Sequence, residues 1–287
     1  MPSALQTFGL PPFTKAVKRL ILVNVAVWVV LLFARLTVPA VDRWADYYLI
    51  LRPVAVVFHF EFWQLITYSF LHDPHGISHL LFNMLGIWMF GSQFEMDYGK
   101  RRFYELYFWC VAGAAVTTIA IGALGMFAYH QWPIGLFRVM AQIWGTATLG
   151  ASGGVYGLLV AFAVLNGNRA LYVYGLVPVK ARYLAIFYLF LSFVNAFSGA
   201  NGVAEFAHLG GALFAWIYLR YLPRYGLQTA ASEGLFGVRN AYYRWKRRRA
   251  ARKFEVYMRK TNRREFFDDK GNYHGPRLDK DDDRWVN

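Results

Sequence analysis

Apolar residues occur along this chain in long runs that are separated by short charged turns. A helix needs about 20 predominantly apolar residues to cross the roughly 30 Å hydrocarbon core of a bilayer. The pattern therefore predicts an all-α membrane protein with six transmembrane helices. The runs cover residues 18–38, 79–95, 103–127, 152–167, 183–199 and 206–223.

The fourth run is shorter than the others. A helix from Ser152 to Asn166 is about 22 Å long at about 1.5 Å per residue, which is less than the hydrocarbon thickness. We therefore expect a short central fourth helix with one end inside the bilayer. The outer loop from His130 to Thr148, with a turn at Trp132-Pro133, is expected to carry non-helical backbone down to Ser152.

Composition and charge support this reading. The chain is 57% hydrophobic and 19% aromatic, with only 17% charged residues, as in integral membrane proteins. The net charge of +14 comes from basic residues concentrated at the termini and in alternate loops. By the positive-inside rule both termini are cytoplasmic. The single cysteine, Cys110, excludes an intrachain disulfide.

Three regions follow from these patterns. Residues 1–16 form a cytoplasmic lead, residues 17–223 a six-helix domain, and residues 224–287 a basic, partly disordered cytoplasmic tail. Seventeen of the 31 Lys and Arg residues lie in this tail, which favours contact with anionic lipid. Nucleic-acid binding is not expected.

The segment from Pro39 to Ser78 is rich in aromatic residues but is interrupted by charges and prolines. Aromatic side chains favour the headgroup level of a membrane because they combine an apolar body with a polar tip. We expect this first outer loop to be embedded in the membrane interface.

Ser152 stands in the sequence Gly150-Ala151-Ser152-Gly153-Gly154 at the start of the fourth helix. The glycines allow a second chain to approach, and the free N–H groups and positive dipole of a helix start favour a developing anion. This arrangement fits a nucleophile. Ordinary small-residue packing between membrane helices explains the same stretch equally well.

His79 and Asn83 lie four residues apart on one face of the second apolar run. Burying both groups in a membrane costs several kcal/mol unless they find partners or water, which favours a wet polar site over packing alone. His75 and His79 also have a spacing found in zinc sites, but Gly76 disfavours a helix there and no glutamate follows His75 as a metalloprotease base. No metal is expected.

His208 leads a face of small residues, Gly211 and Ala215, on the sixth run. This face predicts close packing against the Ser152 helix, so that His208 acts as the base for Ser152. Glu205 lies three residues before His208, where it could face away, and we expect a Ser-His dyad without a carboxylate. Tyr156, one turn after Ser152, is expected to stack on the imidazole.

An attacked carbonyl would become an oxyanion, which needs fixed hydrogen-bond donors. We expect these donors to be the side chains of His79 and Asn83 and the backbone N–H of Ser152.

Over about residues 55 to 220 the sequence resembles the rhomboid family of intramembrane serine proteases. The resemblance is carried by His79-Leu80-Leu81-Phe82-Asn83, Gly150-Ala151-Ser152-Gly153 and Ala207-His208-Leu209-Gly210-Gly211. It implies a six-helix rhomboid-like bundle and cleavage of single-pass transmembrane substrates near the outer membrane surface. It also implies lateral substrate entry past the fifth helix and no metal or cofactor.

Two positions depart from the family pattern. Gln64 follows Trp63 where the family often has arginine, and Ala215 replaces the second glycine of the sixth helix. Neither changes the nucleophile or base.

Two functions other than serine proteolysis stay open. One is a proteolytically silent rhomboid-like protein that binds and escorts membrane segments, and the other is a small-solute transporter or metal-dependent enzyme. A bacterial plasma membrane is the expected location.

Overall fold

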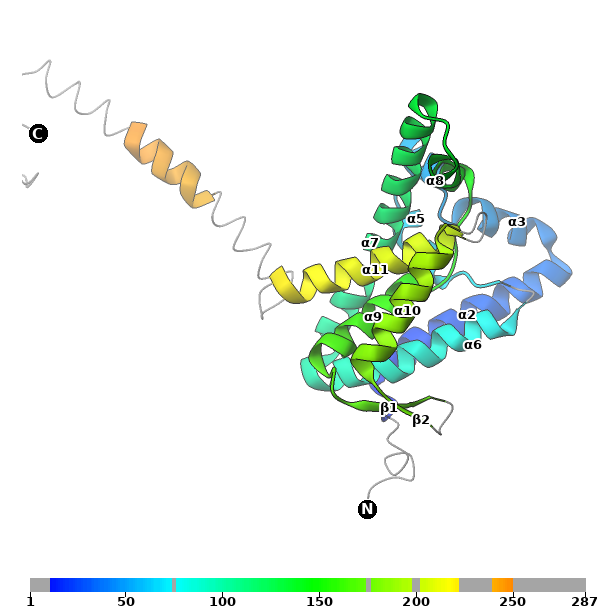
Figure 1. Cartoon of the computed structure of the whole chain (residues 1–287), viewed down its shortest axis with the longest axis vertical. Helices are drawn as coiled ribbons and strands as arrows, with labels where there is room; N and C mark the ends of the chain where they lie inside the picture. Colours follow the sequence, from blue (N-terminus) through cyan, green and yellow to red (C-terminus); the bar gives the residue numbers. More distant parts are fainter. Residues whose placement is uncertain (1–10, 74–75, 174–176, 198–201, 222–238, 250–287) are drawn as a thin grey trace, which may run out of the picture. The chain divides into compact units, whose positions relative to one another are not determined.

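A computed structural model describes residues 11–73, 76–173, 177–197, 202–221 and 239–249 (Figure 1). The elements of the described chain are α2 (Lys15–Thr37), α3 (Pro39–Tyr48), α4 (Pro53–Phe58), α5 (Gln64–Thr67), η1 (Tyr68–Phe70), α6 (Ile77–Gly86), η2 (Ile87–Gly91), α7 (Ser92–Gln131), α8 (Gly135–Gly145), α9 (Ser152–Leu165), β1 (Ala170–Val173), β2 (Val177–Lys180), α10 (Ala181–Asn195) and α11 (Gly202–Tyr221).

Among the described helices of ten or more residues, α9 has the largest share of buried residues. Eight of its 14 residues are buried, and it contacts α11 and α7 most extensively, with further contacts to α6, η2 and α10. A helix that is apolar all round is stable only when other helices cover it. The central position of α9 therefore follows from its sequence, and it places Ser152 among several other helices.

The apolar runs correspond to helices. Among the described residues, the stretches Lys15–Thr37, Ile77–Gln131 and Gly202–Tyr221 are long and apolar enough to cross a membrane, and α9 and α10 are shorter apolar helices. The second stretch is interrupted at Gly99, where φ is +81°, so it forms two helices. This interruption lies inside the charged turn at residues 97–102 between the second and third runs.

The segment that we predict to be the first outer loop is built from short helices. α3, α4, α5 and η1 follow one another between α2 and α6, and aromatic side chains such as Trp44, Phe58 and Phe60 are more than half exposed. The loop is joined to the segment before α9 by paired backbone hydrogen bonds of 3.0 and 2.9 Å between Leu51 and Thr148. The outer loop thus supports the chain that leads to Ser152.

Two elements differ from the sequence expectation. Residues 135–145 form the helix α8 rather than an irregular loop, because apolar side chains such as Met140 and Ile143 lie on one face and pack against α7. The strands β1 and β2 pair in antiparallel fashion, with Ala170 opposite Lys180. They lie between α9 and α10, where only a turn was expected.

The chain divides into two compact units, Met1–Gly226 and Leu227–Asn287. In the second unit the described residues, 239–249, form one helix with exposed side chains. Most of the predicted disordered tail at 224–287, and residues 1–10 of the predicted lead, lie outside the described residues. The boundaries at 16 and 223 remain predictions.

Candidate active site

Ser152 is the first residue of α9, and the backbone before it is held in an unusual conformation. Gly150 has a φ of +114°, which only glycine adopts without strain. Its N–H donates a 3.0 Å hydrogen bond to the carbonyl of Tyr68 in the outer loop. A side chain at Gly150 would also come within 2.9 Å of the His79 ring. The glycine therefore allows both the turn into α9 and the approach of His79.

His208 of α11 contacts the Ser152 hydroxyl directly. Its Nε2 lies 2.8 Å from Ser152 Oγ, which is a normal hydrogen-bond distance. The approach depends on Gly211, one turn later, because a Cβ atom there would collide with the carbonyl group of Gly153 on α9. The structure thus brings together the two side chains that the sequence analysis paired.

Tyr156 stacks on the imidazole of His208. The ring centroids are 4.2 Å apart and the planes differ by 5°, which is the expected stack. The Tyr156 hydroxyl is 3.0 Å from the hydroxyl of the buried Ser192 on α10. The ring that supports His208 is therefore fixed by the neighbouring helix as well.

Glu205 faces His208, and the expectation that no carboxylate contacts this imidazole is wrong. Glu205 Oε2 lies 2.9 Å from His208 Nδ1, the ring nitrogen opposite the one that meets Ser152. The two residues are three apart on α11, so they share a helix face. Spacing alone allowed this contact, but the direction of the glutamate side chain depends on its surroundings.

His79 lies in the first turn of α6, beside Gly150. Its Nδ1 accepts a long, 3.5 Å hydrogen bond from the backbone N–H of Asp73. Its Cε1 and Nε2 atoms face Gly150, and Ser152 Oγ borders the same space. His79 therefore presents Nε2 toward the region next to the serine.

Asn83 is buried one turn after His79 on α6. Its Nδ2 donates a 2.8 Å hydrogen bond to the carbonyl of His79, and an amide nitrogen carries a second hydrogen. The face that holds His79 and Asn83 continues to Gly86, where Val155 of α9 packs against the backbone. This face is therefore turned toward α9.

His72 is a buried histidine next to His79, and sequence reasoning gave it no role. The two rings are 5.3 Å apart. Burial, and to a smaller extent the neighbouring His79, lower the pKa of His72 to about 4, although a hydrogen bond with the backbone of Phe70 opposes this in part. His72 is thus neutral at pH 7. His75, the other histidine of the metal alternative, lies outside the described residues, among which no group of three possible metal ligands gathers.

Gln64 organises the outer loop in place of the arginine of the family pattern. Its side chain is fully buried. Nε2 donates a 2.5 Å hydrogen bond to Glu61 Oε2, and Oε1 accepts a 2.9 Å hydrogen bond from the backbone N–H of Arg52. Trp63 donates from Nε1 to the carbonyl of Tyr48 at 2.7 Å. A neutral amide therefore joins these parts of the loop through its hydrogen bonds.

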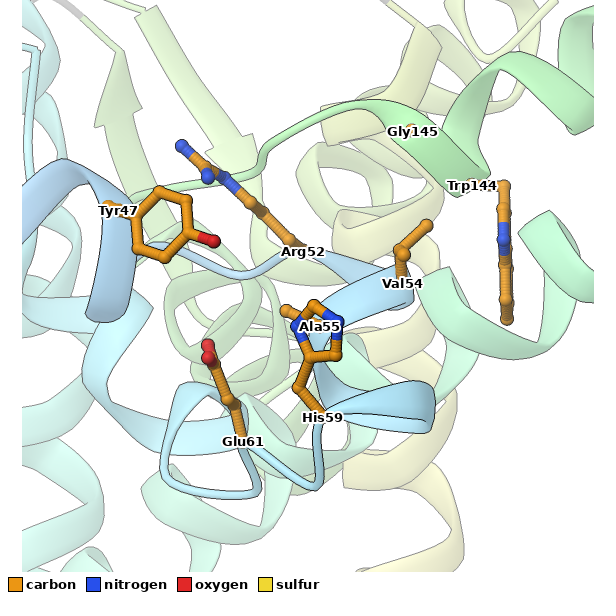
Figure 2. Close-up of a pocket in the computed structure, with 8 residues that line it drawn as sticks. All are labelled: Tyr47, Arg52, Val54, Ala55, His59, Glu61, Trp144 and Gly145. Atoms are coloured by element: carbon orange, nitrogen blue, oxygen red, sulfur yellow. The ribbon is translucent and has the colours of Figure 1, made fainter.

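A cavity of about 150 Å³ lies in this outer region. Figure 2 shows Tyr47, Arg52 and Glu61 at one end and Trp144 at the other. Ser152, His79 and His208 do not line it. The cavity is thus separate from the cluster around Ser152.

Known proteins share this chain's central region. The model of the Rhomboid domain matches residues 59–225, which include the three motifs and all the side chains gathered around Ser152. The match covers more than half of the chain.

Three relatives illustrate the likeness. The mitochondrial RHOMBOID-like protein 12 of Arabidopsis thaliana is 29% identical over 164 residues, covering 54% of this chain and 46% of the relative. Rhomboid protease GluP of Bacillus subtilis is 30% identical over 167 residues, 58% of this chain and 27% of GluP. YdcA of Bacillus subtilis is 32% identical over 168 residues, 57% of this chain and 71% of YdcA.

The first two alignments span less than half of the relatives' own lengths. The chain therefore shares only part of the length of these two relatives. From the domain match and these alignments together, the chain belongs to the rhomboid family of membrane-embedded proteins.

Proposed function

We propose that this protein is a serine endopeptidase that hydrolyses peptide bonds in or next to the transmembrane segments of membrane proteins. The observation that carries the proposal is the 2.8 Å contact between Ser152 Oγ and His208 Nε2 at the start of a buried helix. A serine hydroxyl becomes an effective nucleophile when a neighbouring imidazole takes its proton. GluP, a relative named as a rhomboid protease, supports the same conclusion.

In the first step, Ser152 Oγ attacks the carbonyl carbon of the substrate while His208 Nε2 takes the hydroxyl proton. The tetrahedral intermediate then breaks its C–N bond. His208 returns the proton to the leaving amine, and the acyl group stays on Ser152 as an ester. In the second step, water attacks this ester with His208 again as base, which releases the carboxylic acid and restores the serine.

The negative oxygen of each intermediate requires donors. His79 suits this role because Nδ1 accepts the Asp73 N–H, so the ring proton resides on Nε2, which faces the region beside Ser152. The second amide hydrogen of Asn83 and the N–H of Ser152, one of the free donors in the first turn of α9, complete the proposed set.

The membrane setting follows from helix length. α9 has 14 residues and is about 21 Å long, so we place Ser152 below the outer surface of a hydrocarbon layer of about 30 Å. In this proposal six helices cross the membrane with both termini on the cytoplasmic side. The substrates are single-pass or other transmembrane proteins. The basic tail contacts anionic lipid, and a bacterial plasma membrane is the proposed location, although one relative is mitochondrial.

The test uses the full chain in liposomes with a transmembrane reporter. Ser152→Ala and His208→Ala should each lower the cleavage rate by at least about 1,000-fold. Removing either residue leaves only the stabilisation of the transition state by the oxyanion donors and by substrate binding. The parent, but not Ser152→Ala, should react with a fluorophosphonate probe. Ser92→Ala, which removes a buried hydroxyl from α7, is the matched control and should cleave normally.

Retained cleavage in folded Ser152→Ala protein would contradict the proposal. So would a parent protein that binds the reporter without cutting it and without probe labelling, which is the behaviour of a silent, escorting rhomboid-like protein.

A further inference from the structure

We propose that Glu205 is a positioning residue that completes a Ser152-His208-Glu205 triad in this rhomboid protein. The inference rests on the proposed serine-protease function and adds a third member to the expected pair. It starts from the linear arrangement of the three side chains. Ser152 Oγ and Glu205 Oε2 meet opposite nitrogens of one imidazole, at 2.8 and 2.9 Å.

The carboxylate decides which ring nitrogen carries the proton. An ionised carboxylate only accepts hydrogen bonds, so His208 Nδ1 must carry a hydrogen to make this contact. In the neutral imidazole, Nε2 is then the unprotonated nitrogen. Nε2 accepts the hydrogen bond from the Ser152 hydroxyl, and this is the arrangement that proton removal requires.

The carboxylate also stabilises the charged form of the base. When Nε2 takes the serine proton, His208 becomes an imidazolium, and the negative charge of Glu205 lies 2.9 Å from its Nδ1. The side chains of both residues are more than four-fifths buried, at 15% and 19% exposure for His208 and Glu205. Limited exposure strengthens the interaction because water screens it less. Glu205 keeps its charge throughout and takes no proton.

Glu205 is held by its surroundings. It lies in the first turn of α11, where the helix dipole favours a negative charge. The side chains of Ser192 and Asn195 on α10 also interact with its carboxylate. Ser192 in turn contacts the hydroxyl of Tyr156, whose ring covers one face of His208. α10 therefore supports the imidazole both through the stacked ring and through the carboxylate.

A glutamate near a helix start also stabilises the helix, so the test must separate this role from positioning. Glu205→Gln keeps the size of the side chain but removes its charge. Its amide can donate to Nδ1, which would place the ring hydrogen on Nε2, the wrong nitrogen for a base. Glu205→Asp keeps the charge, and Glu205→Ala leaves space for a small carboxylate from solution.

The experiment measures kcat and KM for a transmembrane reporter in liposomes, together with the rate of fluorophosphonate labelling. For Glu205→Gln we expect kcat to fall by about 100-fold or more, since a carboxylate-to-amide change in the triad template costs about 10,000-fold. KM should change less than about twofold. The labelling rate should fall in parallel with kcat. Asp97→Asn, the same chemical change at an exposed site bonded to Gln93, should leave all three values unchanged.

Chemical rescue supplies an outcome that a structural role would not produce. Added formate should raise the kcat of Glu205→Ala by about tenfold or more. It should not change the kcat of Ser152→Ala. Glu205→Asp should be more active than Glu205→Gln. If Glu205→Gln does not fold, the rescue of Glu205→Ala decides the question.

Two results would overturn the inference while leaving the proposed function intact. One is a folded Glu205→Gln enzyme whose kcat is within about twofold of the parent. The other is a folded Glu205→Ala enzyme of low activity that formate does not restore. If instead Ser152→Ala cleaves as well as the parent, the proposed function itself fails.

Discussion

At the scale of single residues, His72 is a buried titratable group next to the site that takes no part in the proposed chemistry. Burial lowers its folded-state pKa to about 4, whereas an unfolded histidine has a pKa near 6.5. Between these values the unfolded chain binds a proton that the folded protein does not. The contribution of His72 to stability is therefore full above about pH 6.5 and is lost as the pH falls toward 4.

We expect the unfolding temperature in detergent to decrease from pH 7 to pH 4, with His72 contributing about 3 kcal/mol of the lost stability. In His72→Leu this part of the pH dependence should disappear. His130→Leu, at an exposed position near the end of α7, serves as the control. Identical pH profiles for the parent and His72→Leu would show that His72 does not titrate as its burial indicates.

The sequence predicted the main members of the site at this scale. Ser152, His208 and Tyr156 could be paired because small residues at fixed helical spacing mark the faces that approach each other. Glu205 could not be placed, because the direction of a side chain three residues away depends on the partners offered by α10. Gln64 was recognised as a departure, but its hydrogen bonds depend on backbone groups in another part of the loop.

At the scale of elements, the contact between α9 and α11 determines whether the serine and the histidine meet. Gly211 packs against the backbone of Gly153, and Ala215, one turn later, is fully buried. A methyl group at position 211 has no space, whereas the methyl group of Ala215 is already accommodated. The two positions of the small-residue face are therefore not equivalent.

We expect Gly211→Ala to separate the helices and lower both the unfolding temperature and the fluorophosphonate labelling rate, the latter by at least about tenfold. Ala215→Gly should cost only about 1 kcal/mol of stability, the usual difference in helix propensity, and should label normally. Thermal unfolding and labelling of the two variants side by side provide the measurement. Equal effects at both positions would mean that this close contact does not control the site.

Helices and turns differed in how well the sequence predicted them. The apolar runs identified the long helices because membrane helices require such runs. Helix α8 was missed because its amphipathic pattern was read as part of an irregular return to Ser152. The strand pair β1 and β2 was missed because each strand has only four residues.

At the scale of the whole molecule, the proposed topology can be tested with cysteine chemistry. Cys110 is the only cysteine in the sequence and is fully buried, so the parent should not react with a membrane-impermeant maleimide. Arg43→Cys, in α3 of the outer loop, should react in intact cells. Asp97→Cys, at the opposite turn, should react only after the membrane is permeabilised.

Both introduced cysteines stand at exposed positions. Each should therefore react once the membrane is permeabilised, and this reaction serves as the control for access. If only Asp97→Cys reacts in intact cells, the orientation of the protein in the membrane is opposite to the proposed one. Reaction of both would contradict an odd number of crossings between these positions.

The length of α10 has a consequence for the surrounding lipid. This helix has 15 residues, about 22 Å, and side chains such as Ile186, Phe190 and Phe193 are more than half exposed on its outer face. Lipid tails beside so short an apolar surface must compress or tilt. If α10 crosses the membrane as proposed, the bilayer next to it would be thinner than elsewhere, and a guest helix with a short apolar stretch would fit there better than a long one. Membrane thickness would in this way sort the proteins that reach Ser152.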